Sequence, residues 1–382
     1  MHPFLEKRLQ DIRDAGLHRS LRECVFGAGR QVCMDGRMLV DFASNDYLGL
    51  AADPLMAAAS QEALARYGTG GRASRLICGT HTLCAKLEAA TAAFKGSDAA
   101  LVFASGYALN ATVLPALAGE GCAILADRLN HASMVDGARL SRARLFVYSH
   151  NDMDALEKAL VRTRDYACRL IVTDTVFSMD GDIAPLAAIH RLAKAHDALV
   201  MADEAHATGV LGPQGRGAVE AAGLSGKIDF VMGTYSKALG SLGAFVACGA
   251  GERDYLLNTA RGLIFTTALP PVVLAASLKG LALVSVADAA RARLAAIGEQ
   301  VRGQCRSMGF DTGKSCTQII PVILGKEEQA VVAARQLQEK GYLVPAVRFP
   351  TVKKGEARLR ISLSAAHTDR DIEQLLNALE GL

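Results

Sequence analysis

Hydrophobic residues recur along the chain with two different periods. Leu5, Leu9 and Ile12 lie at helical spacing among charged residues, which predicts a short amphipathic helix near the amino terminus. Between residues 100 and 249, apolar runs of four to seven residues alternate with stretches of helical spacing. Such runs are typical of strands buried on both faces, so this order predicts a mostly parallel sheet covered by helices. The runs occur in ALVFASGY, CAILAD, RLIVTDTVFS, ALVMADEAH, DFVMGTYSK and GAFVACG.

The carboxyl-terminal part of the chain has a different pattern. A long helical stretch over residues 287–305 leads to three strand-like runs, IIPVILG, LVPAVRF and ARLRISLS, and to an amphipathic helix over residues 371–382. This pattern predicts a small α+β domain. We therefore expect three units: an amino-terminal helix and extended segment over residues 1–44, a large α/β domain over 45–281, and the small domain over 282–382.

Composition and charge narrow the class of protein. Of the 382 residues, 51% are hydrophobic and 21% charged, and the net charge is only +3. No run of Lys and Arg exceeds two residues, which argues against a nucleic-acid or membrane-surface partner. The nine cysteines form no Cys-x-x-Cys pair, which argues against a disulfide framework and a zinc site. The amino terminus is charged, and Pro270, Pro271 and Lys279 interrupt the most apolar stretch, so we expect a cytoplasmic protein without a bound metal.

The tetrapeptide DEAH at residues 203–206 has two possible meanings. In a nucleic-acid motor it would form the Walker B strand, but a motor also needs a Gly-x-x-x-x-Gly-Lys-Ser/Thr phosphate loop. The nearest candidate, AAGLSGKI, follows Asp203 in the chain, begins with Ala221 and has Ile228 after its lysine. The motor interpretation therefore fails. Asp203 could still be a strand-end residue that caps the next helix.

Lys237 supports a second interpretation of the tetrapeptide, as part of a cofactor site. It follows a buried strand in GTYSKALGSLGAF, where small neighbours leave its amine partly desolvated and able to attack a carbonyl. A single lysine in a Gly-rich turn is more often a surface residue, so the interpretation depends on its companions. Asp203 is a strand-end carboxylate that could keep a heterocycle protonated, and His206 follows three residues later. Pyridoxal 5′-phosphate would account for this set.

Further residues suit the same cofactor. His206 and Ser178 could hydrogen-bond its phenolic oxygen, and His131 could stack on its ring and move a proton. Its phosphate needs main-chain N–H groups at a helix amino terminus. Gly106 and Tyr107 follow a predicted strand and precede a predicted helix, and Thr234 adds a hydroxyl.

The ordered motifs identify a family. From about Arg19 to Leu379 the chain resembles the α-oxoamine synthases, which are pyridoxal-phosphate enzymes of aminotransferase fold-type I. The resemblance implies a PLP-dependent transferase fold-type I, with a large domain built on a mixed, mostly parallel sheet and a small α+β domain. The motifs are SNDYLGL, GTGGRASRLICGTHTLCAKLE, ASGYALN, NHAS, FSMDGDIAPL, DEAHATGVLG, GTYSKALGSLG, PTV and ARLRISLSAAHT.

The resemblance also implies an activity and an assembly. The family joins an amino acid to an acyl thioester with loss of carbon dioxide. By resemblance, Lys237 bonds to the cofactor, Asp203 pairs with its ring nitrogen, and His131 stacks on the ring and contacts substrate. His206 and Ser178 hold the phenolic side, and Gly106, Tyr107 and Thr234 hold the phosphate. The family is homodimeric with a shared site, so Thr266 would reach the neighbour's phosphate, and Arg360 would bind the amino-acid carboxylate.

Within the family, three segments favour the branch that condenses L-alanine with a pimeloyl thioester in biotin synthesis. They are AGLHRSLR, whose Arg19 would contact substrate, HNDMDALE, and AVRFPTVKKGEARLRISLSAAHT, with Thr351 as a second contact. The loop GTGGRASRLICGT resembles equally the branch that uses glycine and an acetyl thioester, and Phe349 stands where the first branch often has Pro. We expect the first branch, with the glycine branch as the alternative, and two further branches of the family, one that forms 5-aminolevulinate and one that joins serine to a palmitoyl thioester, also compete. The carrier of the acyl group, coenzyme A or a carrier protein, remains open.

Overall fold

A central seven-stranded sheet organises the computed structural model, which describes residues 1–14, 16–27 and 29–382. The sheet is parallel except for β10, which runs antiparallel to both of its neighbours. The mixed, mostly parallel sheet expected from the apolar runs is thereby confirmed. In spatial order the strands are β4 (Ala99–Phe103), β10 (Ala244–Cys248), β9 (Phe230–Thr234), β8 (Leu199–Asp203), β7 (Cys168–Asp174), β5 (Cys122–Asp127) and β6 (Arg144–Tyr148).

The pattern of apolar runs missed one strand, β6. It lies at the edge of the sheet and pairs only with β5, so it is not buried on both faces. Only Tyr148 among its five residues is buried. Its sequence, RLFVY, contains the continuous apolar run LFVY, which was an available signal for a strand at this position.

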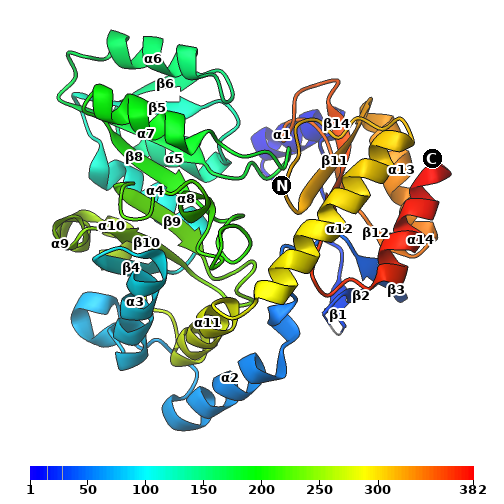
Figure 1. Cartoon of the computed structure of the whole chain (residues 1–382), viewed down its shortest axis with the longest axis horizontal. Coiled ribbons are helices and arrows are strands. Elements are labelled where there is room, and N and C mark those ends of the chain that lie inside the picture. Colours follow the sequence, from blue (N-terminus) through cyan, green and yellow to red (C-terminus); the bar gives the residue numbers. More distant parts are fainter. Residues whose placement is uncertain (15, 28) are drawn as a thin grey trace.

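Helices cover both faces of the sheet, and each face has its own hydrophobic core (Figure 1). Successive residues of β5 show the division, because Ala123 and Leu125 pack into one core and Ile124 and Ala126 into the other. One face is covered by α4 (Gly106–Leu117), α5 (Ala132–Leu140), α9 (Ala250–Thr259) and α10 (Arg261–Ile264), and the other by α3 (Thr82–Lys95), α6 (Met153–Arg162), α7 (Leu186–Ala195), α8 (Ala218–Ala221) and α11 (Pro271–Val284).

A smaller three-stranded sheet forms the carboxyl-terminal part, in the order β11 (Ile319–Gly325), β14 (Ala357–Ser362) and β13 (Ala346–Val347). The single strand expected over residues 343–349 is in fact two short pieces, because Tyr342–Leu343 (β12) pairs with a different sheet. Pro345, which has no N–H to donate, lies between them. The helices here are α12 (Asp288–Ser307), α13 (Glu327–Glu339) and α14 (Asp369–Glu380).

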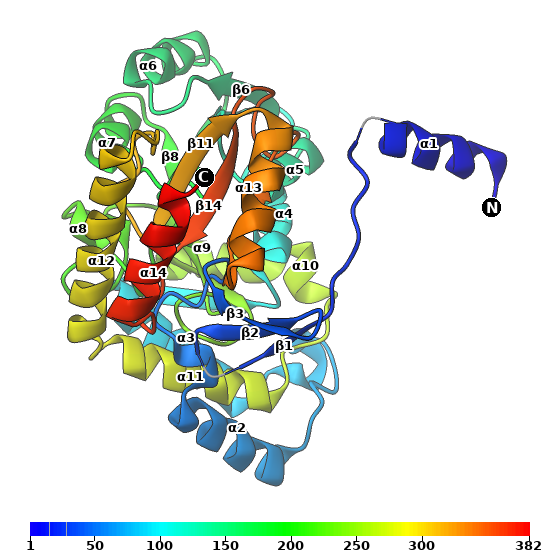
Figure 2. The same cartoon turned by 90° about the vertical axis from the view of Figure 1, so that its right-hand side faces the viewer.

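The amino-terminal segment is joined to this small unit. β1 (Cys24–Phe26), β2 (Gln31–Met34) and β3 (Arg37–Asp41) form an antiparallel sheet, and β3 pairs in parallel with β12. The expected first helix is present as α1 (Pro3–Asp14), but none of its residues is buried, and Figure 2 shows it standing away from the rest of the chain. The remaining helices are α2 (Pro54–Tyr67), a short 3₁₀ turn (Leu50–Ala52) and a π-helical turn (Arg75–Gly79).

No single helix among the described residues is long and apolar enough to cross a bilayer. One pair, α11 and α12, passes the same test of length and composition only when taken together, and the two are bent by 75°.

Candidate active site

The segments at the carboxyl ends of five strands, β4, β5, β7, β8 and β9, line a cavity of about 280 Å³. Because parallel strands end at the same edge of a sheet, residues far apart in the sequence meet there. Seven of the residues expected to bind the cofactor line this cavity. They are Gly106, Tyr107, His131, Asp203, His206, Thr234 and Lys237, and they are joined by Ser105, Asn110, Ser133, Asp174, Ala205, Met232 and Ser236.

The amino terminus of α4 forms one wall. Ser105 caps the helix by accepting a hydrogen bond from Ala108 N at 3.2 Å. The free main-chain N–H groups of the first turn of α4 lie at the cavity, and the positive end of the helix dipole there attracts anions. A Cβ atom at Gly106 would lie 2.9 Å from Met232 Cε, so a side chain there would intrude on the wall. This wall suits a phosphate group.

Lys237 lies half-buried in the wall of the cavity. Burial lowers the pKa of its amine, while the charges of Asp203 and Asp174 act in the opposite direction. Its Nζ atom is 3.0 Å from Nε2 of His206, whose own pKa burial holds well below its usual value. A larger fraction of the amine is therefore unprotonated at neutral pH than in water, as a nucleophile requires.

Asp203 is held by two donors. Its side chain accepts hydrogen bonds from Asn110 Nδ2 at 2.8 Å and from Ala205 N at 2.9 Å. Asn110 Nδ2 also donates to Ser133 Oγ at 2.9 Å, and Asn110 Oδ1 is a buried acceptor without a partner among the described residues. These contacts orient the carboxylate before any ligand is present.

A second buried carboxylate, Asp174, positions His131. Its Oδ2 accepts a hydrogen bond from His131 N at 2.7 Å, and the His131 ring Nδ1 is 2.8 Å from Ser133 Oγ. Burial and the nearby charge of Asp203 raise the pKa of Asp174 well above its usual value. Burial lowers the pKa of His131. The His131 ring is thus neutral and fixed at the cavity wall.

A chain of polar side chains runs from His206 to the small unit. The Tyr47 hydroxyl is 2.6 Å from His206 Nδ1 and 3.0 Å from Asn45 Oδ1. Asn45 Oδ1 also accepts a hydrogen bond from Arg360 at 3.2 Å. We did not single out Asn45, Tyr47, Asn110 or Asp174 from the sequence. Three of them stand in the motifs SNDYLGL and ASGYALN, so the motifs were the available signal.

Five expected site residues do not line the cavity. Arg360 and Ser178 are joined to one another, since Arg360 Nε donates to the Ser178 carbonyl at 2.6 Å. Arg19 and Thr351 instead line a separate cavity of about 290 Å³. Thr266 follows α10 and is half-buried away from the cavity. Their expected roles remain predictions.

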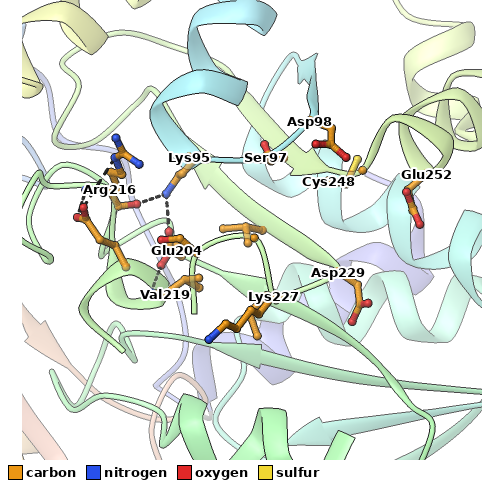
Figure 3. A pocket seen from close by; sticks show the side chains of 18 of the residues that line it. Lys95, Ser97, Asp98, Glu204, Arg216, Val219, Lys227, Asp229, Cys248 and Glu252 are labelled. Carbon is orange, nitrogen blue, oxygen red and sulfur yellow. Dashed lines mark hydrogen bonds and ion pairs between the residues drawn. The ribbon is translucent and has the colours of Figure 1, made fainter. Parts of the chain in front are cut away.

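A larger cavity, of about 510 Å³, is lined by none of the residues expected to bind the cofactor (Figure 3). At its edge Lys95 forms a buried ion pair with Glu204 and donates to Thr208 Oγ1 at 2.8 Å. Glu204 also accepts from Val219 N at 2.7 Å. Because Glu204 follows Asp203 directly, this ion pair anchors the turn that carries Asp203 and His206.

The residues of the cavity of about 280 Å³ around Lys237 fit pyridoxal phosphate. A helix amino terminus next to a glycine suits its phosphate, a buried carboxylate its ring nitrogen, and an amine with a lowered pKa its carbonyl carbon. The free Asn110 Oδ1 is a further polar atom for a ligand to meet. No group of three or more metal-ligating side chains is present in the part of the chain that the structure describes.

Comparisons with known proteins identify the family of this chain. The model of the family described as aminotransferase class I and II matches residues 37–379. The 8-amino-7-oxononanoate synthase of Geobacter sulfurreducens is 49% identical, over 97% of this chain and 95% of that protein. A solved structure of SPT with PLP is 34% identical, with a TM-score of 0.93 over 99% of this chain and 96% of the other. The structure of 8-amino-7-oxononanoate synthase from Francisella tularensis is 29% identical, with a TM-score of 0.79 over 90% of this chain and 97% of the other. The chain therefore belongs to the aminotransferase class I and II family, and within it to the α-oxoamine synthases that the ordered motifs predicted.

Proposed function

We propose that this protein binds pyridoxal phosphate and makes 8-amino-7-oxononanoate by condensing L-alanine with a pimeloyl thioester and releasing carbon dioxide. The observation that carries the proposal is the convergence of Lys237, Asp203 and His131 on one cavity. Relatives that are 45% to 49% identical over nearly the whole chain have the name of this activity, which supports the choice of substrates.

The proposal assigns a role in the reaction to each of these residues. When bound, pyridoxal phosphate supplies an electron sink for a carbanion at the amino acid's Cα. Lys237 would hold the cofactor through Nζ, and the same Nζ would accept the Cα proton of the amino acid. Asp203 keeps the ring nitrogen protonated by charge pairing. His131 covers the ring face, and His206 and Ser178 serve the phenolic oxygen.

The remaining residues bind and orient. Gly106, Tyr107 and Thr234 hold the phosphate, and Arg360 binds the amino-acid carboxylate. Arg360 donates to the Ser178 carbonyl, to Ser362 Oγ and to Asn45 Oδ1, which leaves two of the five N–H groups of a guanidinium for the carboxylate. Arg19 and Thr351 contact the acyl chain from the separate cavity of about 290 Å³, which also has apolar lining residues such as Met179 and Phe349.

We further propose a cytoplasmic homodimer with shared sites, in which Thr266 reaches the neighbour's phosphate. The three sequence units, 1–44, 45–281 and 282–382, then serve respectively as substrate cover, cofactor-binding domain and carboxylate-binding domain. Equilibrium sedimentation and mixing of Lys237→Ala with Thr266→Ala subunits test this part, because a shared site predicts activity in the mixed dimers.

A second activity is favoured by a specific observation. The SPT structure superimposes with a TM-score of 0.93, against 0.79 for the 8-amino-7-oxononanoate synthase structure. Serine with a long-chain thioester is therefore the competing substrate pair to test, together with glycine and an acetyl thioester.

The test is direct product analysis. The purified protein is incubated with pyridoxal phosphate and each amino acid, paired with pimeloyl, acetyl or palmitoyl thioester on coenzyme A or on a carrier protein. We expect 8-amino-7-oxononanoate and stoichiometric carbon dioxide from L-alanine and pimeloyl thioester, and none from Lys237→Ala. A higher kcat/KM with either other pair would refute the proposed substrates.

A further inference from the structure

His150 lies outside the cavity, between two buried carboxylates. It follows β6, and its Nδ1 is 3.0 Å from Asp127 Oδ1 while its Nε2 is 2.8 Å from Asp182 Oδ2. Asp127 is completely buried and Asp182 nearly so. Ionised carboxylate oxygens only accept hydrogen bonds, so with both carboxylates ionised each ring nitrogen donates and the imidazole is protonated. Asn151 Nδ2 is 3.3 Å from the same Nε2, and in this arrangement it donates instead to Asp182 Oδ2 at 3.0 Å. The ring also packs edge-on against Phe177, with the ring centroids 4.4 Å apart.

Asp127 belongs to the loop that carries His131. It ends β5, and its side chain accepts hydrogen bonds from Leu129 N and from Asn151 N, both at 2.8 Å. Asn130, in the same loop, donates to Val172 O at 2.8 Å and accepts from Asp174 N at 3.0 Å. Any movement of Asp127 is therefore transmitted along a short, tightly bonded loop to His131.

Asp182 belongs to the turn that carries Ser178. This turn is closed by hydrogen bonds from Gly181 N to Phe177 O at 2.8 Å and from Phe177 N to Asp182 O at 3.1 Å. The Ser178 carbonyl within it accepts the bond from Arg360 Nε. The position of Asp182 therefore helps to set the position of Arg360.

We propose that His150, as an imidazolium, is a positioning residue that ties the His131 loop to the Ser178 turn and so holds Arg360 in place for the amino-acid carboxylate. The role of Arg360 in this proposal rests on the proposed function. The link consists of Asp127, His150 and Asp182, which belong to three separate segments of the chain. None of these three residues lines the cofactor cavity.

The ionisation of His150 agrees with this role. Burial alone would lower its pKa, but the hydrogen bonds and charges of Asp127 and Asp182 outweigh burial and raise the pKa to about 9. Three other titratable groups face the pair: Tyr148 and Asp174 near Asp127, and Cys316 near Asp182. Burial raises the pKa of all three, which disfavours their charged forms, so His150 faces two carboxylates that have few other charged neighbours.

The experiment compares His150→Gln with His190→Gln in the pyridoxal-phosphate-loaded protein. His190 is a half-buried histidine on α7, remote from the cofactor cavity, and controls for loss of a histidine. We expect the KM for L-alanine to rise about tenfold in His150→Gln with a smaller change in kcat, because a charge-assisted bond is worth about a factor of ten or more. The wild-type KM should also rise above about pH 9, and this ionisation should vanish in the variant.

Two readouts do not depend on turnover. Nitrogen-15 spectra of histidine-labelled protein should show a ring that stays protonated on both nitrogens at pH 7.5 in the wild type and in His190→Gln. Hydrogen exchange of the amides of residues 177–184 should be faster in His150→Gln than in either. If His150→Gln does not fold, Asp182→Asn serves as the second variant, and we expect the same rise in KM.

The outcomes separate the two proposals. A neutral His150 ring at pH 7.5 in the wild type would overturn the positioning role. The same holds if the KM for L-alanine of His150→Gln equals that of His190→Gln. If the wild type does not use L-alanine at all, the proposed function fails, and ring protonation together with hydrogen exchange then decides whether the link between the two loops exists.

Discussion

Replacing Tyr47 with phenylalanine tests the polar chain that leads to Lys237. Tyr47 is completely buried, and its hydroxyl contacts both His206 Nδ1 and Asn45 Oδ1. The variant loses the hydroxyl and leaves the buried His206 nitrogen without this partner, which costs about 1–3 kcal/mol of unfolding free energy. The His206 ring is then free to turn away from the Lys237 amine, 3.0 Å from its other nitrogen. We therefore expect a loss of reactivity as well as of stability.

The assay needs a variant that loses only stability. Tyr235→Phe is suitable, because the buried Tyr235 hydroxyl bonds to Thr91 Oγ1 at 2.7 Å and takes no part in the His206 chain. We measure guanidinium unfolding and the rate at which cofactor-free protein reacts with pyridoxal phosphate. Both variants should lose about 1–3 kcal/mol, but only Tyr47→Phe should react more slowly, by about tenfold. Equal reaction rates in the two variants would refute the reasoning.

Three further predictions concern charge. Asp203→Asn should lower kcat by about 10- to 1,000-fold, the span of the 1–3 pKa units that an opposite charge confers on its partner, and an unchanged kcat would remove Asp203 from its role. Arg360→Lys should raise the KM for the amino acid by about tenfold, because a point charge replaces a planar fork, and an unchanged KM would show that the carboxylate binds elsewhere. Burial lowers the pKa of His367 to about 4, and its Nδ1 accepts a bond from Ser364 N at 3.0 Å, which protonation would break. The stability that this neutral histidine contributes is present above pH 6.5 and is lost as the pH falls toward 4, so urea titrations should show about 3 kcal/mol less stability at pH 4 that His367→Gln largely abolishes.

The sequence predicted the strands and the residues at their ends more reliably than the contacts between elements. The buried runs and the positions of Asp203 and Lys237 follow from hydrophobic periodicity and from the rule that parallel strands end at one edge. Asn110 and Asp174 were missed because their roles depend on tertiary contacts, with Asp203 and His131 respectively, that the local sequence does not show. The pairing of β12 with β3 was also missed, because it joins residues about 300 positions apart, which no local pattern reveals.

Lys95, which is buried, and Lys237, which is half-buried, differ in the partners of their amines. Burial lowers the pKa of both Lys95 and Lys237. Lys95 contacts Glu204, Thr208 Oγ1 and the Arg216 carbonyl, three acceptors that match the three N–H groups of an ammonium ion and leave none for chemistry. Lys237 forms no ion pair among the described residues, although Asp203 lines the same cavity. Asp203 is instead held by Asn110 and Ala205 N, while Glu204, the next residue, is held from the other side by Lys95. The turn between β8 and His206 thus keeps the acid oriented apart from the amine, so that each is free for a different atom of the cofactor.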